Sequence, residues 1–374
     1  MLKPPYAEKD ISGCAVVGIM NISGNNFGSE KIVNAIKCMR DRSNGLGGGF
    51  AAYGIYPEHK DLYAFHMMYL DTNRRYDAED FLKKKFNIAA SERIPTAKVN
   101  SISESPVLWR YFLSVENKPP LMSEEDFVVQ TVIYINANID GAFVASSGKN
   151  MGVFKGVGYP EDIARFYKLQ DYEAYIWLSH GRFPTNTVGW WGGAHPFNIL
   201  DWSVVHNGEL SSYGTNARYL EMYGYKCELM TDTEVVAYTM DLLMRRHKLP
   251  LNLVAKVIAA PLWKEIDNLE PKERRILTRL RQTYSSLLLN GPFSFIIANQ
   301  DQMIGITDRI RLRPLIYASN KDMFYISTEE AAIRTIESDL KNIKIPRGGE
   351  PVVAQLLTSD IRHQTSSSRE GATN

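Results

Sequence analysis

Short runs of apolar residues, separated by glycine and polar turns, dominate both ends of the chain. Successive apolar positions without polar alternation are typical of strands that are buried on both faces. The runs that predict strands are 15–22, 50–56, 128–136, 175–179, 202–206, 293–299, 303–307, 315–318 and 324–327.

Three longer segments have the spacing of amphipathic helices. Segment 30–42 places Ile32 and Ile36 on one face, and segment 231–246 opens with Thr-Asp-Thr-Glu, a helix N-cap and first turn. Segment 271–289 begins with proline and is followed by a glycine. The mixture of strands and helices predicts one continuous α/β domain built from layers of sheet and helix.

The composition narrows the classes of function. The chain has 43 Lys and Arg residues and 42 Asp and Glu residues, which gives a formal charge of +1. It therefore lacks the positive electrostatic field that a nucleic-acid-binding or membrane-surface protein needs. The chain has 374 residues but only three cysteines, without a Cys-x-x-Cys pair, which argues against a disulfide framework, a zinc finger or an iron–sulfur cluster. We expect no metal site, no membrane span and a cytoplasmic location.

A glycine run at 45–49 lies between a predicted helix and a predicted strand. A dinucleotide-binding turn requires the reverse order, strand then glycines then helix, so the run indicates a turn with close packing. No phosphate-binding loop, zinc-protease motif or serine-hydrolase elbow is present.

Polar residues are densest between 178 and 234, where they follow predicted strands or open a helix. Each has an ordinary interpretation: His180 and His206 as core histidines, Asn207-Gly208 as a hairpin turn, and Asp232 as a helix N-cap. Together with Arg182 they offer a guanidinium, an amide beside a glycine N–H, and a carboxylate. Those groups could hold an amino acid by its two charged ends and stabilise an oxyanion.

Cys14 is the candidate nucleophile for such a site. Most cysteines within a chain are small buried hydrophobic residues. If the chain were cut after Gly13, however, Cys14 would carry a free α-amine with a pKa of about 8, which could act as general base for its own thiol.

In these residues the chain resembles the class II, N-terminal-nucleophile glutamine amidotransferases, and most closely the stand-alone amidotransferase subunit of archaeal-type glutamate synthase. The resemblance covers nearly everything from Cys14 to about residue 357. The matching motifs lie at 14–21, 42–45, 182–187, 206–209, 231–234, 291–294, 308–315, 327–329 and 347–350.

The resemblance implies an αββα sandwich of two stacked sheets flanked by helices. It implies a propeptide over residues 1–13 and an amidotransferase domain over 14–360 with an insertion at about 59–172. The Ser/Thr-rich composition of residues 361–374, without apolar anchors, predicts a disordered tail.

The resemblance also implies the roles of individual residues. Cys14 would attack the side-chain amide of L-glutamine, and Asn207 and the Gly208 N–H would hold the oxyanion. Arg182, with Thr185, would bind the α-carboxylate of the substrate, and Asp232 would bind its α-ammonium group.

A complete glutamate synthase also needs FMN and an iron–sulfur cluster, which the resemblance places on separate, flavin-containing partner subunits. The chain would then deliver ammonia to those subunits. Two alternatives remain: an amidotransferase subunit of another complex, such as N-methylglutamate synthase, or a glutamine-sensing module of the same fold without catalysis.

Overall fold

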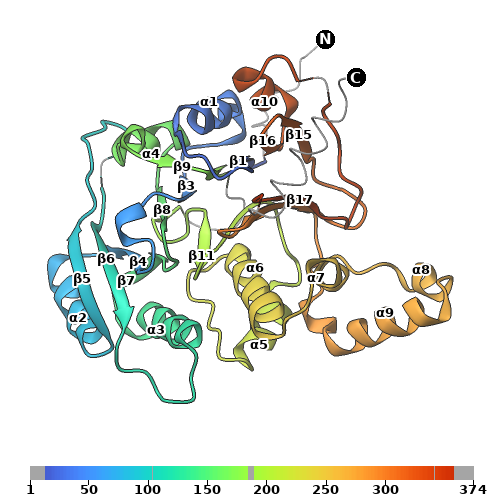
Figure 1. Ribbon diagram of the computed structural model, residues 1–374, viewed down its shortest axis with the longest axis horizontal. Coiled ribbons are helices and arrows are strands. Elements are labelled where there is room, and N and C mark those ends of the chain that lie inside the picture. The colour runs from blue at the N-terminus through green and yellow to red at the C-terminus, as the bar shows by residue number, and fades with distance from the viewer. Residues whose placement is uncertain (1–12, 103, 184–188, 341, 358–374) are drawn as a thin grey trace, which may run out of the picture.

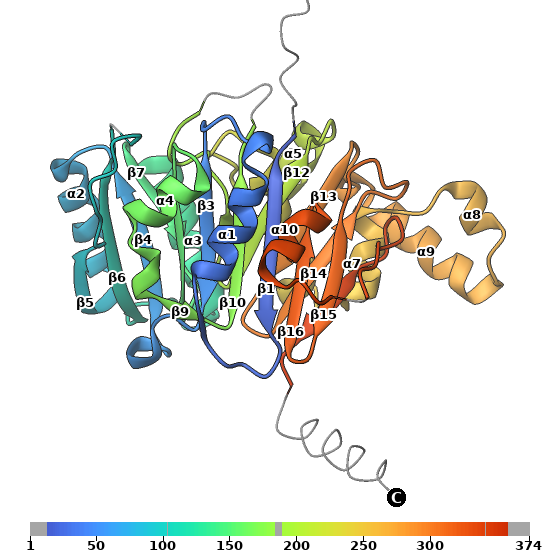
Figure 2. The ribbon, with the colours of Figure 1, turned by 90° about the horizontal axis from the view of Figure 1, so that it is seen from above.

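The computed structural model describes residues 13–102, 104–183, 189–340 and 342–357. Two antiparallel sheets lie at its centre, one against the other (Figures 1 and 2). The larger sheet has six strands in the order β15 (Ile316–Asn320), β16 (Met323–Ser327), β1 (Ala15–Asn21), β10 (Ile176–Gly181), β3 (Gly48–Tyr53) and β8 (Met151–Gly156).

The second sheet has five strands, and its order is β11 (Phe197–Ile199), β12 (Trp202–Gly208), β13 (Phe293–Ala298), β14 (Gln302–Thr307) and β17 (Val352–Gln355). All the pairings within the two sheets are antiparallel. Strands β3, β10 and β13 are buried along their whole length and β1 is buried except at Asn21, as the unbroken apolar runs predict.

The space between the two sheets is filled by apolar side chains from both. Val16 and Leu178 from the larger sheet are part of the same buried cluster as Val205, Ile296 and Met303 from the smaller one. At Gly18, in the middle of β1, a Cβ atom would lie 2.6 Å from the sulfur of Met303. The absence of a side chain there lets the sheets approach closely.

Helices cover the two outer faces. On the larger sheet lie α1 (Glu30–Cys38), α4 (Pro160–Phe166) and α10 (Glu330–Ile336). On the smaller sheet lie α5 (Tyr213–Glu221), α6 (Asp232–Met240) and α7 (Leu251–Ile258). The order helix, sheet, sheet, helix confirms the predicted αββα sandwich (Figure 1).

A third, four-stranded sheet lies beside the sandwich, within the predicted insertion. Its strand order is β5 (Phe86–Arg93), β6 (Val107–Val115), β4 (Tyr63–Tyr69) and β7 (Ala142–Ser146). Helices α2 (Thr72–Lys83) and α3 (Glu124–Asn138) pack against it (Figures 1 and 2).

The strand predicted at 128–136 is wrong, because these residues form most of α3. Ser123 caps this helix by accepting a hydrogen bond from the N–H of Asp126, and three acidic residues form its first turn. Between residues 127 and 136, only Gln130 and Tyr134 have exposed side chains. These two residues are four positions apart. A helix buried on most of its surface therefore resembles a buried strand in sequence.

The three predicted helices are present. Segment 30–42 forms α1 and a 3₁₀ turn, Arg40–Arg42, and segment 231–246 forms α6 and a π-helical turn, Asp241–Arg246. Segment 271–289 forms α9 (Pro271–Thr283), which ends six residues before the predicted end and is followed by a 3₁₀ turn, Ser285–Leu287. Together with α8 (Trp263–Asp267), α9 extends away from the sandwich (Figures 1 and 2).

The remaining named strands are short. β2 (Phe27–Gly28) pairs with β9 (Glu173–Ala174).

None of the helices in the described part of the chain is long and apolar enough to cross a membrane. Except for Gly13, the predicted propeptide lies outside the described residues, as does the predicted tail.

His66 joins the third sheet to the sandwich. The ring of this β4 residue is buried, with Nδ1 3.0 Å from the carbonyl oxygen of Val153 in β8 and Nε2 2.7 Å from the hydroxyl of Tyr56. Because a carbonyl only accepts, Nδ1 carries the proton and Nε2 accepts from Tyr56. Burial lowers the pKa of His66 from its ordinary 6.5 to about 3.

We predict that His66 makes the protein less stable in acid. Its pKa in the unfolded chain is above that in the folded chain, so its contribution is full above pH 6.5 and is lost as the pH falls. Between pH 7 and pH 5, wild type should lose about 2 kcal/mol more unfolding free energy than His66→Gln. Denaturant titrations at both pH values measure this, and equal losses would contradict the prediction.

Candidate functional site

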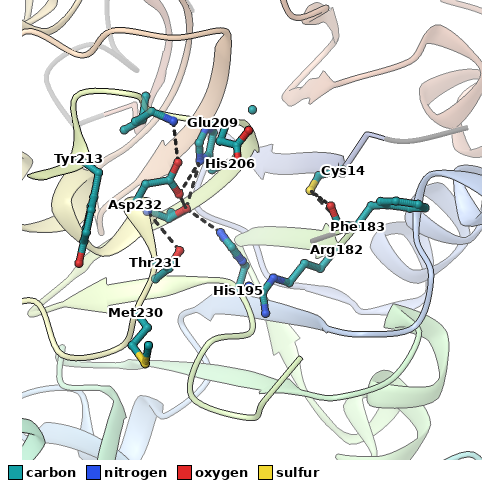
Figure 3. A pocket seen from close by; sticks show the side chains of 13 residues that line it. Cys14, Arg182, Phe183, His195, His206, Glu209, Tyr213, Met230, Thr231 and Asp232 are labelled. Carbon is teal, nitrogen blue, oxygen red and sulfur yellow. Dashed lines mark hydrogen bonds and ion pairs between the residues drawn. The ribbon is translucent and has the colours of Figure 1, made fainter. Parts of the chain in front are cut away.

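A cavity of about 370 Å³ opens where strands of both sheets end and α6 begins (Figure 3). Four of the predicted site residues line it: Cys14, Arg182, Gly208 and Asp232. Asn207 lies one residue before Gly208 in β12, and Thr185 lies outside the described residues. The structure thus gathers residues that are as much as 218 positions apart in the chain, from 14 to 232.

Cys14 stands directly before β1, opposite the residue that follows β10. The β1–β10 register pairs Ala15 with Gly181, so Cys14 and Arg182 leave the sheet side by side. The sulfur of Cys14 accepts a hydrogen bond from the N–H of Phe183 at 3.4 Å. Burial raises the pKa of the Cys14 thiol, and the opposing influence of Phe183, Arg182 and Arg313 is smaller. A thiol in this setting needs a base before it can act as a nucleophile.

The backbone of Arg182 is fixed by the loop that carries the glycine run. Its N–H donates to the carbonyl oxygen of Gly47 at 2.9 Å, and its own carbonyl accepts from the hydroxyl of Ser43 at 3.1 Å. A Cβ on Gly47 would lie 2.9 Å from the Arg182 Cδ. The predicted role of the glycine run as a closely packed turn is confirmed, and what packs there is the site arginine.

The Arg182 guanidinium lies in a strongly desolvated setting, because the residue is only 4% exposed. Burial lowers its pKa, while Cys14 and Asp232 have the opposite effect. The chain therefore keeps a cation beside the thiol, at the edge of a cavity that holds a carboxylate. A cation in such a place is suited to binding an anion.

Asn207 and Gly208 end strand β12 rather than forming a hairpin turn. They pair with Ser294 and Phe293 of β13, and a helix follows at Tyr213. The Asn207 side chain is fully buried, and neither its Oδ1 nor its Nδ2 has a hydrogen-bond partner among the described residues. A buried amide without a partner is costly unless a ligand completes it, which suits the predicted role as an oxyanion donor.

Gly208 has a conformation that only glycine adopts readily. Its φ is +149°, and a Cβ at this position would lie 2.0 Å from the carbonyl oxygen of Pro292. The N–H of the next residue, Glu209, bonds that same carbonyl at 3.0 Å, which holds the turn out of β12 in place.

Asp232 is the first residue of α6, and the N-cap role belongs to Thr231, whose hydroxyl accepts from the N–H of Thr233. One carboxylate oxygen of Asp232 accepts from the N–H of Leu210 at 2.8 Å. Burial tends to raise the pKa of Asp232, but His206 and the hydrogen bonds from Leu210 and Thr233 outweigh burial and leave the pKa below its ordinary value. Asp232 is therefore an anion that faces the cavity.

Sequence reasoning missed two residues at this end of the cavity, His195 and Thr233. His195 stacks on His180 with ring centroids 4.0 Å apart, and both histidines have pKa values lowered by burial, His180 to about 3. His180 is a core histidine, as its ordinary interpretation says, with Nε2 2.8 Å from the carbonyl of His206. The sequence signal for His195 is that it lies in the same polar segment as His180 and His206.

Within the described residues, no group of three or more His, Cys, Asp or Glu side chains is placed to hold a metal ion. The cavity offers a thiol, hydrogen-bond donors, a cation and an anion, which are groups that acyl transfer on a substrate with two opposite charges can use.

The family described as "Glutamine amidotransferases class-II" matches residues 60–347. A protein of Archaeoglobus fulgidus named "Uncharacterized protein" is 50% identical over 358 residues, which cover 94% of this chain and 95% of that protein.

Two relatives with descriptive names are more distant. A putative glutamine amidotransferase of Methanothermobacter thermautotrophicus is 25% identical, over 86% of this chain and 93% of that protein. The large chain of NADPH glutamate synthase from Bacillus subtilis is 26% identical, over 61% of this chain and 16% of that protein.

We predict that Gly208→Ala lowers the unfolding free energy by about 3 kcal/mol, because the new methyl group meets the Pro292 carbonyl in a strained backbone. Gly28→Ala is the matched control, since a Cβ there meets no heavy atom within 4 Å. It should change stability by less than about 0.5 kcal/mol. Denaturant unfolding compares the two, and equal effects would show that the space at Gly208 is not limiting.

Proposed function

Because the chain belongs to the class II glutamine amidotransferases, we propose that it hydrolyses L-glutamine to glutamate and delivers the ammonia to a glutamate synthase partner. The observation that carries the proposal is the convergence of Cys14, Arg182, Gly208 and Asp232 on one cavity. A nucleophile, an oxyanion donor and two opposite charges in one place match the reacting amide and the two charged ends of glutamine.

Cys14 is the proposed nucleophile. Its thiolate attacks the side-chain amide carbon of glutamine, and Asn207 with the Gly208 N–H binds the oxygen that becomes negative. The α-amine of Cys14 takes the thiol proton and gives it to the leaving nitrogen, so that ammonia departs and a thioester remains. Water then attacks the thioester, which releases glutamate and restores the thiol.

The two ends of the cavity select the amino acid. Arg182, together with Thr185, binds the α-carboxylate, and Asp232 binds the α-ammonium group. Support for this comes from the charge order of the cavity, with Arg182 beside Cys14 and Asp232 on the α6 side (Figure 3). Arg182 is 4% exposed and the Asp232 side chain is 20% exposed, so each charge attracts its partner more strongly than it would in water.

We further propose that residues 1–13 are removed to expose the α-amine of Cys14. The high thiol pKa supports this, because the thiol needs a base and no histidine among the described residues bonds its sulfur. Gly13, which precedes the bond to be cut, has no Cβ and a φ of +149°.

The proposed acceptor of ammonia is a flavin-containing glutamate synthase subunit in the cytoplasm, where FMN and an iron–sulfur cluster would be bound. Support comes from the similarity to the Bacillus subtilis glutamate synthase large chain, of which this chain matches only 16%. The three free cysteines are consistent with a reducing compartment.

We predict that the purified protein is thirteen residues short and gains one adduct from 6-diazo-5-oxo-L-norleucine, an electrophilic glutamine analogue. Intact-mass measurement and peptide mapping should place the adduct on an N-terminal Cys14. Cys14→Ala should take no adduct and hydrolyse no glutamine, whereas the control Cys38→Ala, at an exposed cysteine away from the cavity, should behave as wild type. Wild type that binds glutamine without labelling or hydrolysis would indicate a sensor instead.

We also predict that the isolated chain hydrolyses glutamine slowly and that a flavin-containing glutamate synthase subunit accelerates it, because amidotransferase sites often close only when a partner docks. Glutamate release with and without that subunit measures the effect. Full turnover by the isolated chain would contradict this coupling.

A further inference from the structure

Thr233 links the carboxylate of Asp232 to two buried histidines. Its hydroxyl oxygen lies 2.7 Å from Nε2 of His195, 3.1 Å from Nδ1 of His206 and 3.4 Å from Oδ1 of Asp232. The same Nδ1 of His206 is 3.5 Å from Oδ1 of Asp232 (Figure 3). Thr233 is fully buried, and the two histidines are at most 5% exposed.

Counting protons gives this network a single direction. A threonine hydroxyl has one proton to donate and two lone pairs to accept with, and an ionised carboxylate only accepts. All three contacts are satisfied if His195 Nε2–H and His206 Nδ1–H donate to Thr233, and Thr233 donates to Asp232. The other ring nitrogens, Nδ1 of His195 and Nε2 of His206, have no partner among the described residues.

The hydroxyl of Thr233 is not required to start helix α6. The helix is capped by Thr231, whose hydroxyl accepts the backbone N–H of Thr233. The side chain of Thr233 is therefore available for Asp232. The other oxygen of Asp232 is held by the N–H of Leu210, so both oxygens are fixed by donors.

We propose that Thr233, held by His195 and His206, is a positioning residue that orients the Asp232 carboxylate toward the α-ammonium group of the substrate. The network thereby sets the selectivity of the site for α-amino acids over amides that lack the amino group. The Thr233 hydroxyl holds Oδ1 of Asp232 and the Leu210 N–H holds Oδ2, so the orientation of the carboxylate is fixed while Asp232 lines the cavity. The inference rests on the proposed function, because it concerns the substrate of the same cavity.

The experiment compares two reagents that differ only in the amino group: 6-diazo-5-oxo-L-norleucine and 6-diazo-5-oxohexanoate. Rates of Cys14 labelling are measured by mass spectrometry on the full, matured chain. Thr233→Val keeps the shape of the side chain and removes the hydroxyl. It should slow labelling by the amino reagent about tenfold, the effect of one hydrogen bond to a charged group. Labelling by the reagent without the amino group should stay within about twofold.

Three further variants make the test specific. Thr233→Ser restores a hydroxyl and should recover most of the lost rate. Thr239→Val is the matched control, since Thr239 is a fully buried threonine of the same helix whose hydroxyl has no partner among the described residues. It should leave the ratio of the two rates unchanged. His195→Phe removes the hydrogen bond from His195 to Thr233 and should therefore lower the same ratio of rates by about threefold.

The outcomes separate this inference from the proposed function. If Thr233→Val slows both reagents equally, or neither, the positioning role is overturned while the glutaminase proposal stands. If wild-type protein takes no label from 6-diazo-5-oxo-L-norleucine, the proposed function is overturned, and the inference with it. An unchanged ratio in His195→Phe would likewise overturn the part assigned to His195.

Discussion

The pairing of β1 with β10 is the constraint on which the site depends. These two strands run antiparallel in the middle of the larger sheet, and their register sets Ala15 opposite Gly181. Cys14, the proposed nucleophile, therefore enters the sheet where Arg182 leaves it. Neither residue could reach this place from a loop with comparable accuracy, because backbone hydrogen bonds on both sides of β1 fix its position.

The second half of the site comes from the other sheet and depends on how closely the two sheets approach. Val205 of β12 packs between the sheets with Val16 of β1, and strand alternation places Asn207 on the same side as Val205. The buried amide of Asn207 and helix α6, which begins at Asp232, thus face the end of β1 across the apolar core. Packing of small and branched side chains far from the chemistry determines the width of the cavity.

Much of this arrangement follows from the sequence. Unbroken apolar runs such as 15–22 and 293–299 predict buried strands, and the motifs around residues 182, 207 and 232 predict which side chains meet. The helix α3 was mistaken for a strand because its burial removes the polar spacing that identifies a helix. Thr233 was overlooked because a threonine in a helix start has an ordinary explanation, and only the positions of His195 and His206 distinguish it. Contacts between segments that are distant in the chain depend on tertiary packing, so the hydrophobic pattern of a single segment does not predict them.

The glycine at position 18 limits how this protein can change in evolution. Gly18 faces Met303 on the side of β1 that also carries Val16, while Val17 and Ile19 face the outer helices. Inserting or deleting one residue between Cys14 and Gly18 would exchange the two faces of the strand and bring a branched side chain against Met303. Length variation among related chains should therefore accumulate in the third sheet and in the α8–α9 extension, whereas the four-residue spacing from cysteine to glycine is retained.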